Sequence, residues 1–141
     1  MSESLEAVLL ALENRFGAQR SEFRGQVTLI VPAESIIEAC RSLRDEFGFE
    51  RLSALTAVDY WPEQAPRFHA VYSLHSIQHN LRVNLRVPVP GSTPTLPTLE
   101  EVYPSANWYE REIWDMFGIR FEGHSDLRRI LMPADWQGHP L

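Results

Sequence analysis

The sequence predicts an α+β domain: a mainly antiparallel sheet with flanking helices and an extended C-terminal segment. Residues 67–77 and 80–89 both alternate apolar and polar side chains and are separated by a tight turn near Gln78. This is the pattern of a half-buried antiparallel hairpin. Two shorter stretches, 27–31 and 52–61, are further strand candidates. Other stretches repeat apolar residues at helical spacing, so we expect helices to pack on one side of this sheet.

Two helices are predicted in the first third of the chain. Apolar residues recur every three or four positions in residues 5–16 and again in residues 36–47. Gly17 and Gly48 follow these stretches, where a glycine can end a helix. Cys40 lies on the apolar stripe of the second helix, so we expect its thiol to face the core.

Two helices are also predicted after a proline-rich connection. Residues 98–101 form a capping-box pattern that predicts a brief helix. A longer helix is expected to start near Pro104 or Ser105 and to end at Gly118.

Length and composition narrow the class of protein. A chain of 141 residues is expected to form a single domain, residues 1–141. The net charge of -6 argues against broad affinity for nucleic acid or anionic lipid, and all 13 basic side chains are arginines. A single cysteine rules out an internal disulfide and cannot supply the thiolates of an iron–sulfur cluster. The longest apolar run, Ala7 to Leu12, is too short to span a membrane, and no secretory signal is evident.

The hairpin region is basic. No acidic residue occurs between Gln64 and Leu99, whereas Arg67, Arg82, Arg86 and three histidines do. This basic face is expected either to meet an acidic partner or, as the simpler alternative, to be balanced by carboxylates of the chain's own helices.

The late helix has two distinct sides. Placed at 100° per residue, one stripe is apolar and is expected to dock the helix on its own domain. It consists of Ala106, Tyr109, Ile113, Met116 and Phe117. Charged residues and two tryptophans occupy the remaining surface, where we expect an Arg111–Asp115 pair. Tryptophan and arginine are the residue types that anchor protein interfaces, so partner contact is favoured over packing under the C-terminal segment.

Catalytic and metal-binding hypotheses are weaker. Glu112 and Asp115 share a helix face, but a catalytic dyad would also need a pocket and a tuned pKa. His124, Asp126 and His139 could approach a metal, yet their spacing matches no defensible zinc pattern. We therefore predict no catalytic, cofactor-binding or metal-binding residue in this chain.

A family resemblance covers the last quarter of the sequence. The run Glu110-Arg111-Glu112-Ile113-Trp114-Asp115-Met116-Phe117-Gly118-Ile119 closely resembles the signature of the C subunit of respiratory complex I, the NuoC-type or 30-kDa-type subunit. Residues 121–124, 126–133, 135–136 and 138–141 continue the resemblance, and residues 55–60 are a weaker match. Ser125 departs from it, because relatives usually have proline there, so a looser turn is expected. The sequence also ends at Leu141, where relatives usually continue.

This resemblance implies a function. The chain would be a cofactor-free accessory subunit of the peripheral arm of a proton-translocating NADH:quinone oxidoreductase, and would support assembly and the D-type subunit that forms the quinone site. NADH, FMN, iron–sulfur clusters and quinone would then be bound by partner subunits, and the chain would be catalytic only as part of the enzyme. It would lie at the cytoplasmic face of a bacterial-type plasma membrane, attached only through its partners.

The resemblance and the tryptophan-rich surface together give an expected interface. Its residues are Trp108, Glu110, Arg111, Glu112, Trp114, Asp115, Phe117, Gly118, His124, Asp126, Arg128 and Arg129. Two alternative functions remain. One is the same module in a related hydrogenase-type or ferredoxin-linked complex, and the other is a free-standing acid/base hydrolase using Glu112 and Asp115.

Overall fold

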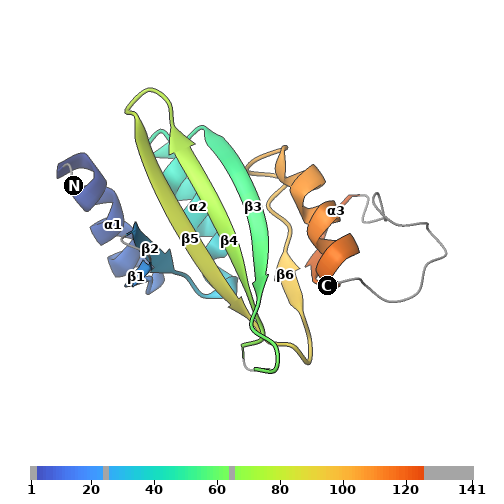
Figure 1. Ribbon diagram of the computed structural model, residues 1–141. Helices are drawn as coiled ribbons and strands as arrows, with labels where there is room; N and C mark the ends of the chain where they lie inside the picture. Colours follow the sequence, from blue (N-terminus) through green and yellow to red (C-terminus); the bar gives the residue numbers. More distant parts are fainter. Residues whose placement is uncertain (1–2, 24–25, 64–65, 126–141) are drawn as a thin grey trace.

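The computed structural model describes residues 3–23, 26–63 and 66–125, and the expected C-terminal segment lies outside them. A five-stranded sheet forms the centre, and a two-stranded sheet lies beside it (Figure 1). The elements are α1 (Glu3–Phe16), β1 (Gln19–Phe23), β2 (Gln26–Ile30), the 3-10 turn η1 (Ala33–Ser35), α2 (Ile36–Asp45), β3 (Arg51–Asp59), β4 (Phe68–Ser76), β5 (Leu81–Val89), β6 (Thr95–Pro97), α3 (Ala106–Phe117) and β7 (Arg120–Glu122).

The large sheet has the strand order β1-β2-β5-β4-β3. Every neighbouring pair is antiparallel except β2 and β5, which are parallel. The predicted mainly antiparallel α+β fold is therefore confirmed. Strand β1 was not predicted, because four of its five residues, Gln19 to Glu22, are polar and give no alternating apolar pattern. An edge strand of this kind depends on pairing with β2 rather than on its own burial.

Side chains of β4 alternate between the two faces of the sheet, as predicted. Phe68, Ala70, Tyr72 and Leu74 are buried, whereas the residues between them are half-buried. The buried side faces α2, which lies behind the strands in Figure 1. Cys40 of α2 is fully buried, and this burial raises the pKa of its thiol. The expectation that this thiol belongs to the core is confirmed.

Predictions of helices were correct for the three long ones and wrong for the short one. α1 and α2 end just before Gly17 and Gly48, which both have positive φ. Residues 98–101 form turns instead of a helix. The hydroxyl of Thr98 donates a 2.6 Å hydrogen bond to the buried carboxylate of Glu110, and the backbone N–H of Leu99 donates to the same group. These contacts with α3 replace the local capping that the pattern suggested.

Helix α3 packs beside β3, the strand at the edge of the sheet. The Tyr109 hydroxyl donates a 2.9 Å hydrogen bond to the carbonyl oxygen of Ser53, and the ring of Phe117 meets Phe68 edge-on at 6.2 Å. Because Phe68 belongs to the buried side of β4, α3 lies on the same side of the sheet as α2. None of the described helices is both long and apolar enough to cross a membrane.

Candidate interaction surface on helix α3

The ends of α3 are defined by Ser105 and Gly118. Gly118 is the C-cap residue with φ 78°, and its N–H donates to the carbonyl oxygen of Trp114 at 3.0 Å. This left-handed conformation is easy for glycine and lets the chain turn directly into β7. Ala106 and Ile113 are buried, which confirms the centre of the predicted apolar stripe. Gly118 thus shapes the surface by ending the helix.

Trp108 and Arg111 form the most exposed part of α3. Trp108 is 51% exposed, and the Arg111 guanidinium lies 5.7 Å from the centre of its indole ring. A cation stacked on an exposed tryptophan presents apolar area and positive charge together. The expected Arg111–Asp115 pair is wrong, since Asp115 is buried and Arg111 reaches towards Trp108 instead.

A groove lies between α3 and the edge strand. Its volume is about 310 Å³. It is lined by Leu55, Thr56, Ala57, Glu112, Ile113, Met116 and Phe117. Apolar walls with a single carboxylate at the rim suit an apolar side chain that carries a basic or polar neighbour. Trp114 is half-buried on the same helix.

Glu110 is not a surface residue, although the helical pattern placed it on the flank of α3. Its side chain is 0% exposed, and its two oxygens accept hydrogen bonds from the Thr98 hydroxyl and the Leu99 N–H at 2.6 and 2.8 Å. Burial, with a smaller contribution from the nearby Glu100, raises the pKa of this carboxyl to about 7 although the two hydrogen bonds oppose the shift. Direct partner contact through Glu110 is therefore excluded in this conformation, and the residue fixes α3 to the preceding turn.

Asp115 and His124 were also expected to contact a partner, but their side chains are buried as that of Glu110 is. The Asp115 side chain is 0% exposed and that of His124 is 1% exposed. Both were expected at the interface because they are positions of the family signature that the sequence resembles. In this fold they pack inside the chain, so any effect on a partner must be transmitted through the surface residues.

His124 joins two carboxylates in a small cluster. Its Nδ1 lies 3.3 Å from Glu100 Oε1, and its Nε2 lies 3.1 Å from the Asn107 carbonyl oxygen and 3.9 Å from Glu110 Oε1. The carboxylate and imidazole atoms lie within 4.8 Å of one another, close enough in principle to hold a metal ion. However, both Glu110 oxygens already accept hydrogen bonds, and both imidazole nitrogens face oxygen acceptors. We therefore interpret the cluster as a hydrogen-bonded junction.

Ser125 stabilises this junction. Its N–H donates a 2.8 Å hydrogen bond to Glu100 Oε1, and its hydroxyl donates to Glu100 Oε2 at 2.8 Å. Burial raises the pKa of Glu100, but the Ser125 hydrogen bonds outweigh it and leave the pKa below its ordinary value. The turn is thus fixed rather than loose, because a serine supplies an N–H that a proline lacks.

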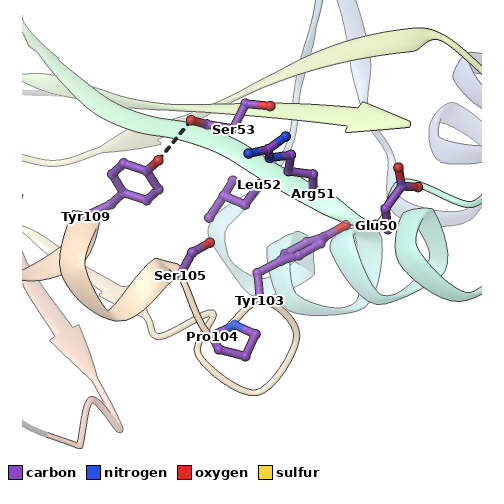
Figure 2. A pocket seen from close by; sticks show the side chains of 8 residues that line it. All are labelled: Glu50, Arg51, Leu52, Ser53, Tyr103, Pro104, Ser105 and Tyr109. Carbon is purple, nitrogen blue, oxygen red and sulfur yellow. Dashed lines mark hydrogen bonds between the residues drawn. The ribbon is translucent and has the colours of Figure 1, made fainter. Parts of the chain in front are cut away.

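A second, more polar pocket of about 320 Å³ lies at the other end of the α3–β3 contact (Figure 2). Tyr109 of α3 reaches across it to Ser53 of β3, and the Tyr103 hydroxyl donates a 2.6 Å hydrogen bond to the carbonyl oxygen of Phe49, just before β3. These two tyrosines attach α3 and the residues that precede it to the region around the start of β3. The described residues that line this pocket include no nucleophile activated by a neighbouring base.

The structure therefore divides the expected interface residues into three groups. Trp108, Arg111, Glu112, Trp114 and Phe117 are at least partly exposed on α3. Glu110, Asp115 and His124 are internal, and Gly118 is the helix cap. Asp126, Arg128 and Arg129 lie outside the described residues.

Sequence reasoning also missed one exposed aromatic residue. Trp61 was assigned to the end of a strand, but it follows β3 and is 65% exposed, with the Arg67 guanidinium 4.9 Å from the centre of its ring. The Trp61-Pro62 dipeptide was the available signal for a turn there.

Comparison with known proteins identifies the family. The family model for the respiratory-chain NADH dehydrogenase, 30 Kd subunit, matches residues 29–141. This chain belongs to that family. The predicted resemblance to the NuoC-type, 30-kDa-type subunits of complex I is thereby confirmed.

Two relatives illustrate the match. The C subunit of NADH-quinone oxidoreductase from Geobacter sulfurreducens is 43% identical over 144 residues, covering 100% of this chain and 88% of the relative. The C/D subunit of NADH-quinone oxidoreductase from Methylococcus capsulatus is also 43% identical, over 152 residues that cover 99% of this chain and 26% of that protein. This 30 Kd family member thus corresponds to about a quarter of the longer C/D protein.

Solved structures share the fold. A trypsin-resistant fragment of Nqo5 superimposes with a TM-score of 0.77 at 35% identity, covering 88% of this chain and 99% of the fragment. A chain of a membrane-bound sulfane sulfur reductase, an archaeal respiratory membrane complex, gives a TM-score of 0.78 at 27% identity, covering 95% of this chain and 79% of the other. The 30 Kd family fold therefore occurs in more than one kind of respiratory complex.

Proposed function

We propose that this chain is a cofactor-free subunit of the peripheral arm of a proton-translocating NADH:quinone oxidoreductase, and that α3 docks onto the D-type quinone-site subunit. The observation that carries the docking proposal is the Trp108–Arg111 pair, in which the tryptophan is 51% exposed and the partly exposed arginine stacks on it. The Methylococcus relative supports the choice of partner, because its name joins the C and D subunits.

Energetics favour docking through this pair. A tryptophan at the centre of an interface typically contributes about 2 kcal/mol or more to binding, and arginine is the other common anchor. In the isolated chain, half of the Trp108 surface contributes nothing to folding. Covering this part of Trp108 with a partner therefore costs no folding free energy.

The proposal assigns the redox cofactors to partner subunits. The only cysteine is buried in the core, and burial disfavours its thiolate, the form that would ligate a cluster. Electron transfer from NADH through FMN and iron–sulfur clusters to quinone would take place in neighbouring subunits. In this arrangement the chain positions those subunits and is held at the cytoplasmic face of the membrane by them.

A second candidate is the same structural role in a related respiratory complex with another electron donor. The similarity to a chain of the sulfane sulfur reductase complex favours it over a free-standing hydrolase. Glu112 lies at the groove rim while Asp115 is buried, so the two carboxylates do not form an accessible acid/base pair.

Native purification tests the proposed function. A tagged chain would be recovered from gently solubilised membranes, its companions identified by mass spectrometry, and quinone reduction measured with NADH as donor. We expect the D-type subunit and NADH-dependent activity with the assembly, and neither cofactor nor turnover with the chain purified alone. Recovery with a complex that does not oxidise NADH would favour the second candidate, and recovery of an active, unaccompanied chain would contradict both.

A further inference from the structure

The large sheet has a second face that no described helix covers. Arg20 of β1 shares a cross-strand row with Leu29 on the buried side, and its guanidinium binds Glu6 and Glu13 of α1. This places α1 on the same side as α2 and α3. The opposite side, called here the open face, is formed by the strand residues that alternate with the buried ones, and it lies on the side of the strands away from α2 in Figure 1.

One row of the open face consists entirely of basic side chains. In the strand register, His75 of β4 lies directly opposite Arg51 of β3 and Arg82 of β5. Arg51 and Arg82 are exposed, and the His75 Nε2 atom is buried without a hydrogen-bond partner in the described part of the chain. The row therefore presents two exposed guanidinium groups, one on β3 and one on β5, on either side of His75.

Positive charge continues further along the same face. Arg86 is only 9% exposed, and it donates to the Tyr60 hydroxyl at 2.5 Å and to His69 Nδ1 at 3.2 Å. Burial and the adjacent Arg86 charge lower the pKa of His69, which therefore accepts this hydrogen bond as a neutral ring. Both of these partners orient the guanidinium.

Carboxylates are absent from the described strand positions of the open face. Those nearest to it lie at its ends and have contacts of their own. At one end Glu50 accepts a hydrogen bond from the N–H of Ile77 and interacts electrostatically with His75. At the other end Asp59 pairs with Arg67, and Glu63 lines a pocket with Tyr60 and His69.

Carboxylates of the described helices have partners on the opposite side of the sheet, where Glu6 and Glu13 of α1 bind Arg20 and Glu38 of α2 binds Arg41. Within the described residues, the helix carboxylates therefore do not balance this basic face as expected, because the helices lie behind it.

We propose that the open face is a second docking surface, and that its occupant is an acidic surface of a neighbouring protein subunit. This inference depends on the proposed function in one respect: the acidic subunit that docks on the open face would belong to the same respiratory complex. A carboxylate-bearing surface supplies what the basic row lacks, and the planar guanidinium fork of arginine pairs with carboxylates through two hydrogen bonds. A flat sheet that mixes these arginines with small polar side chains such as Ser73 and Asn84 fits a protein surface of matching shape.

Charge reversal tests the proposal. In Arg51→Glu/Arg82→Glu, two exposed side chains change sign, so the melting temperature of the isolated chain should change little, as expected for surface substitutions. Its recovery in the native assembly should fall about tenfold or more, because a desolvated contact between like charges costs several kcal/mol. The control, Arg15→Glu/Arg41→Glu, changes the net charge equally on the helical side. It also removes the ion pairs with Glu46 and Glu38, so its melting temperature should fall slightly while it still assembles normally.

Arginine labelling gives an independent readout. Phenylglyoxal should modify Arg51 and Arg82 about tenfold more slowly in the purified assembly than in the isolated chain, as expected for fully desolvated residues. Equal labelling rates in the two states, together with normal assembly of the doubly reversed variant, would overturn the proposal. Loss of assembly in Trp108→Ala with normal assembly of the reversed variant would overturn this inference alone and leave the proposed function intact.

Two other occupants are distinguishable. Sedimentation of the isolated chain with vesicles containing about 30% phosphatidylglycerol, abolished by the reversed variant, would instead assign the face to anionic lipid. Concentration-dependent self-association abolished by the same variant would assign it to a second copy. Either result would overturn the proposal of an acidic partner subunit.

Discussion

Glu110 illustrates how one buried carboxyl organises the α3 surface. It accepts hydrogen bonds from two consecutive residues, Thr98 and Leu99, that come from the turn before α3. Without these bonds, burying a charged carboxyl would cost several kcal/mol. The residue therefore fixes the start of α3, and through it the position of Trp108, without reaching the surface.

The pH dependence of stability should report this role. Because the folded-state pKa of Glu110 is raised to about 7, the folded protein binds a proton more tightly than the unfolded chain does. Its contribution to the free energy of unfolding is then complete below about pH 4.5 and is lost as the pH rises through 7. In Glu110→Gln this dependence disappears, since an amide keeps one donor and one acceptor but carries no charge.

The measurement is a difference between wild type and Glu110→Gln in urea unfolding across pH 5 to 8, in which all other titrating groups cancel. We expect the variant to gain stability relative to wild type as the pH rises, by about 1–3 kcal/mol, because one pKa unit corresponds to about 1.4 kcal/mol. A difference that does not vary with pH would contradict the account of Glu110.

At the scale of the elements, the position of α3 depends on its C-terminal cap, Gly118, as well as on its apolar stripe. Gly118 adopts φ 78° and is followed almost immediately by β7, which pairs with β6. A helix that continued for another turn would carry the following residues away from this small sheet. The glycine thus links the helix surface to the junction around His124.

Replacing Gly118 by alanine should lower the free energy of unfolding by about 1–2 kcal/mol, because a side chain in the left-handed region meets its own backbone. Urea unfolding of the isolated chain measures the effect. Gly91→Ala is the matched control, since Gly91 is not among the described glycines with positive φ, and its effect should be near zero or slightly stabilising. Equal effects of the two substitutions would contradict the importance of the cap.

Predictability from sequence also differs by element. The β4–β5 hairpin was predictable because a period of two along both strands fixes the inward and outward faces. Strand β1 could not be predicted in this way, because its polar residues show no alternation of apolar and polar side chains. The buried positions of Glu110 and Asp115 were missed because helical geometry was combined with the assumption that charge means exposure, whereas hydrogen bonds from distant residues decided at least the first of these.

At the scale of the whole molecule, the sequence showed that residues 64–99 are basic but not which elements pack against them. Whether the helices balance that region depends on which side of the sheet they pack, and this follows from crossover connections that periodicity does not specify. In the described part of the chain, the strand positions of the open face carry arginines and no carboxylate, whereas the helical side carries both arginines and carboxylates that pair with one another. Two differently composed surfaces, the α3 surface and the open face, suit a subunit placed between neighbours.

The most direct test of the central claim compares assembly with stability in Trp108→Ala. Trp108 is 51% exposed and contributes little to the fold, so the melting temperature of the isolated chain should change by less than about 2 °C, as expected for a surface substitution. Recovery of the chain with the D-type quinone-site subunit should fall strongly, whereas Leu10→Ala, which truncates a similarly exposed side chain on α1, should leave recovery unchanged. A large drop in melting temperature, or undiminished recovery with the D-type subunit, would contradict the claim that α3 is a docking surface.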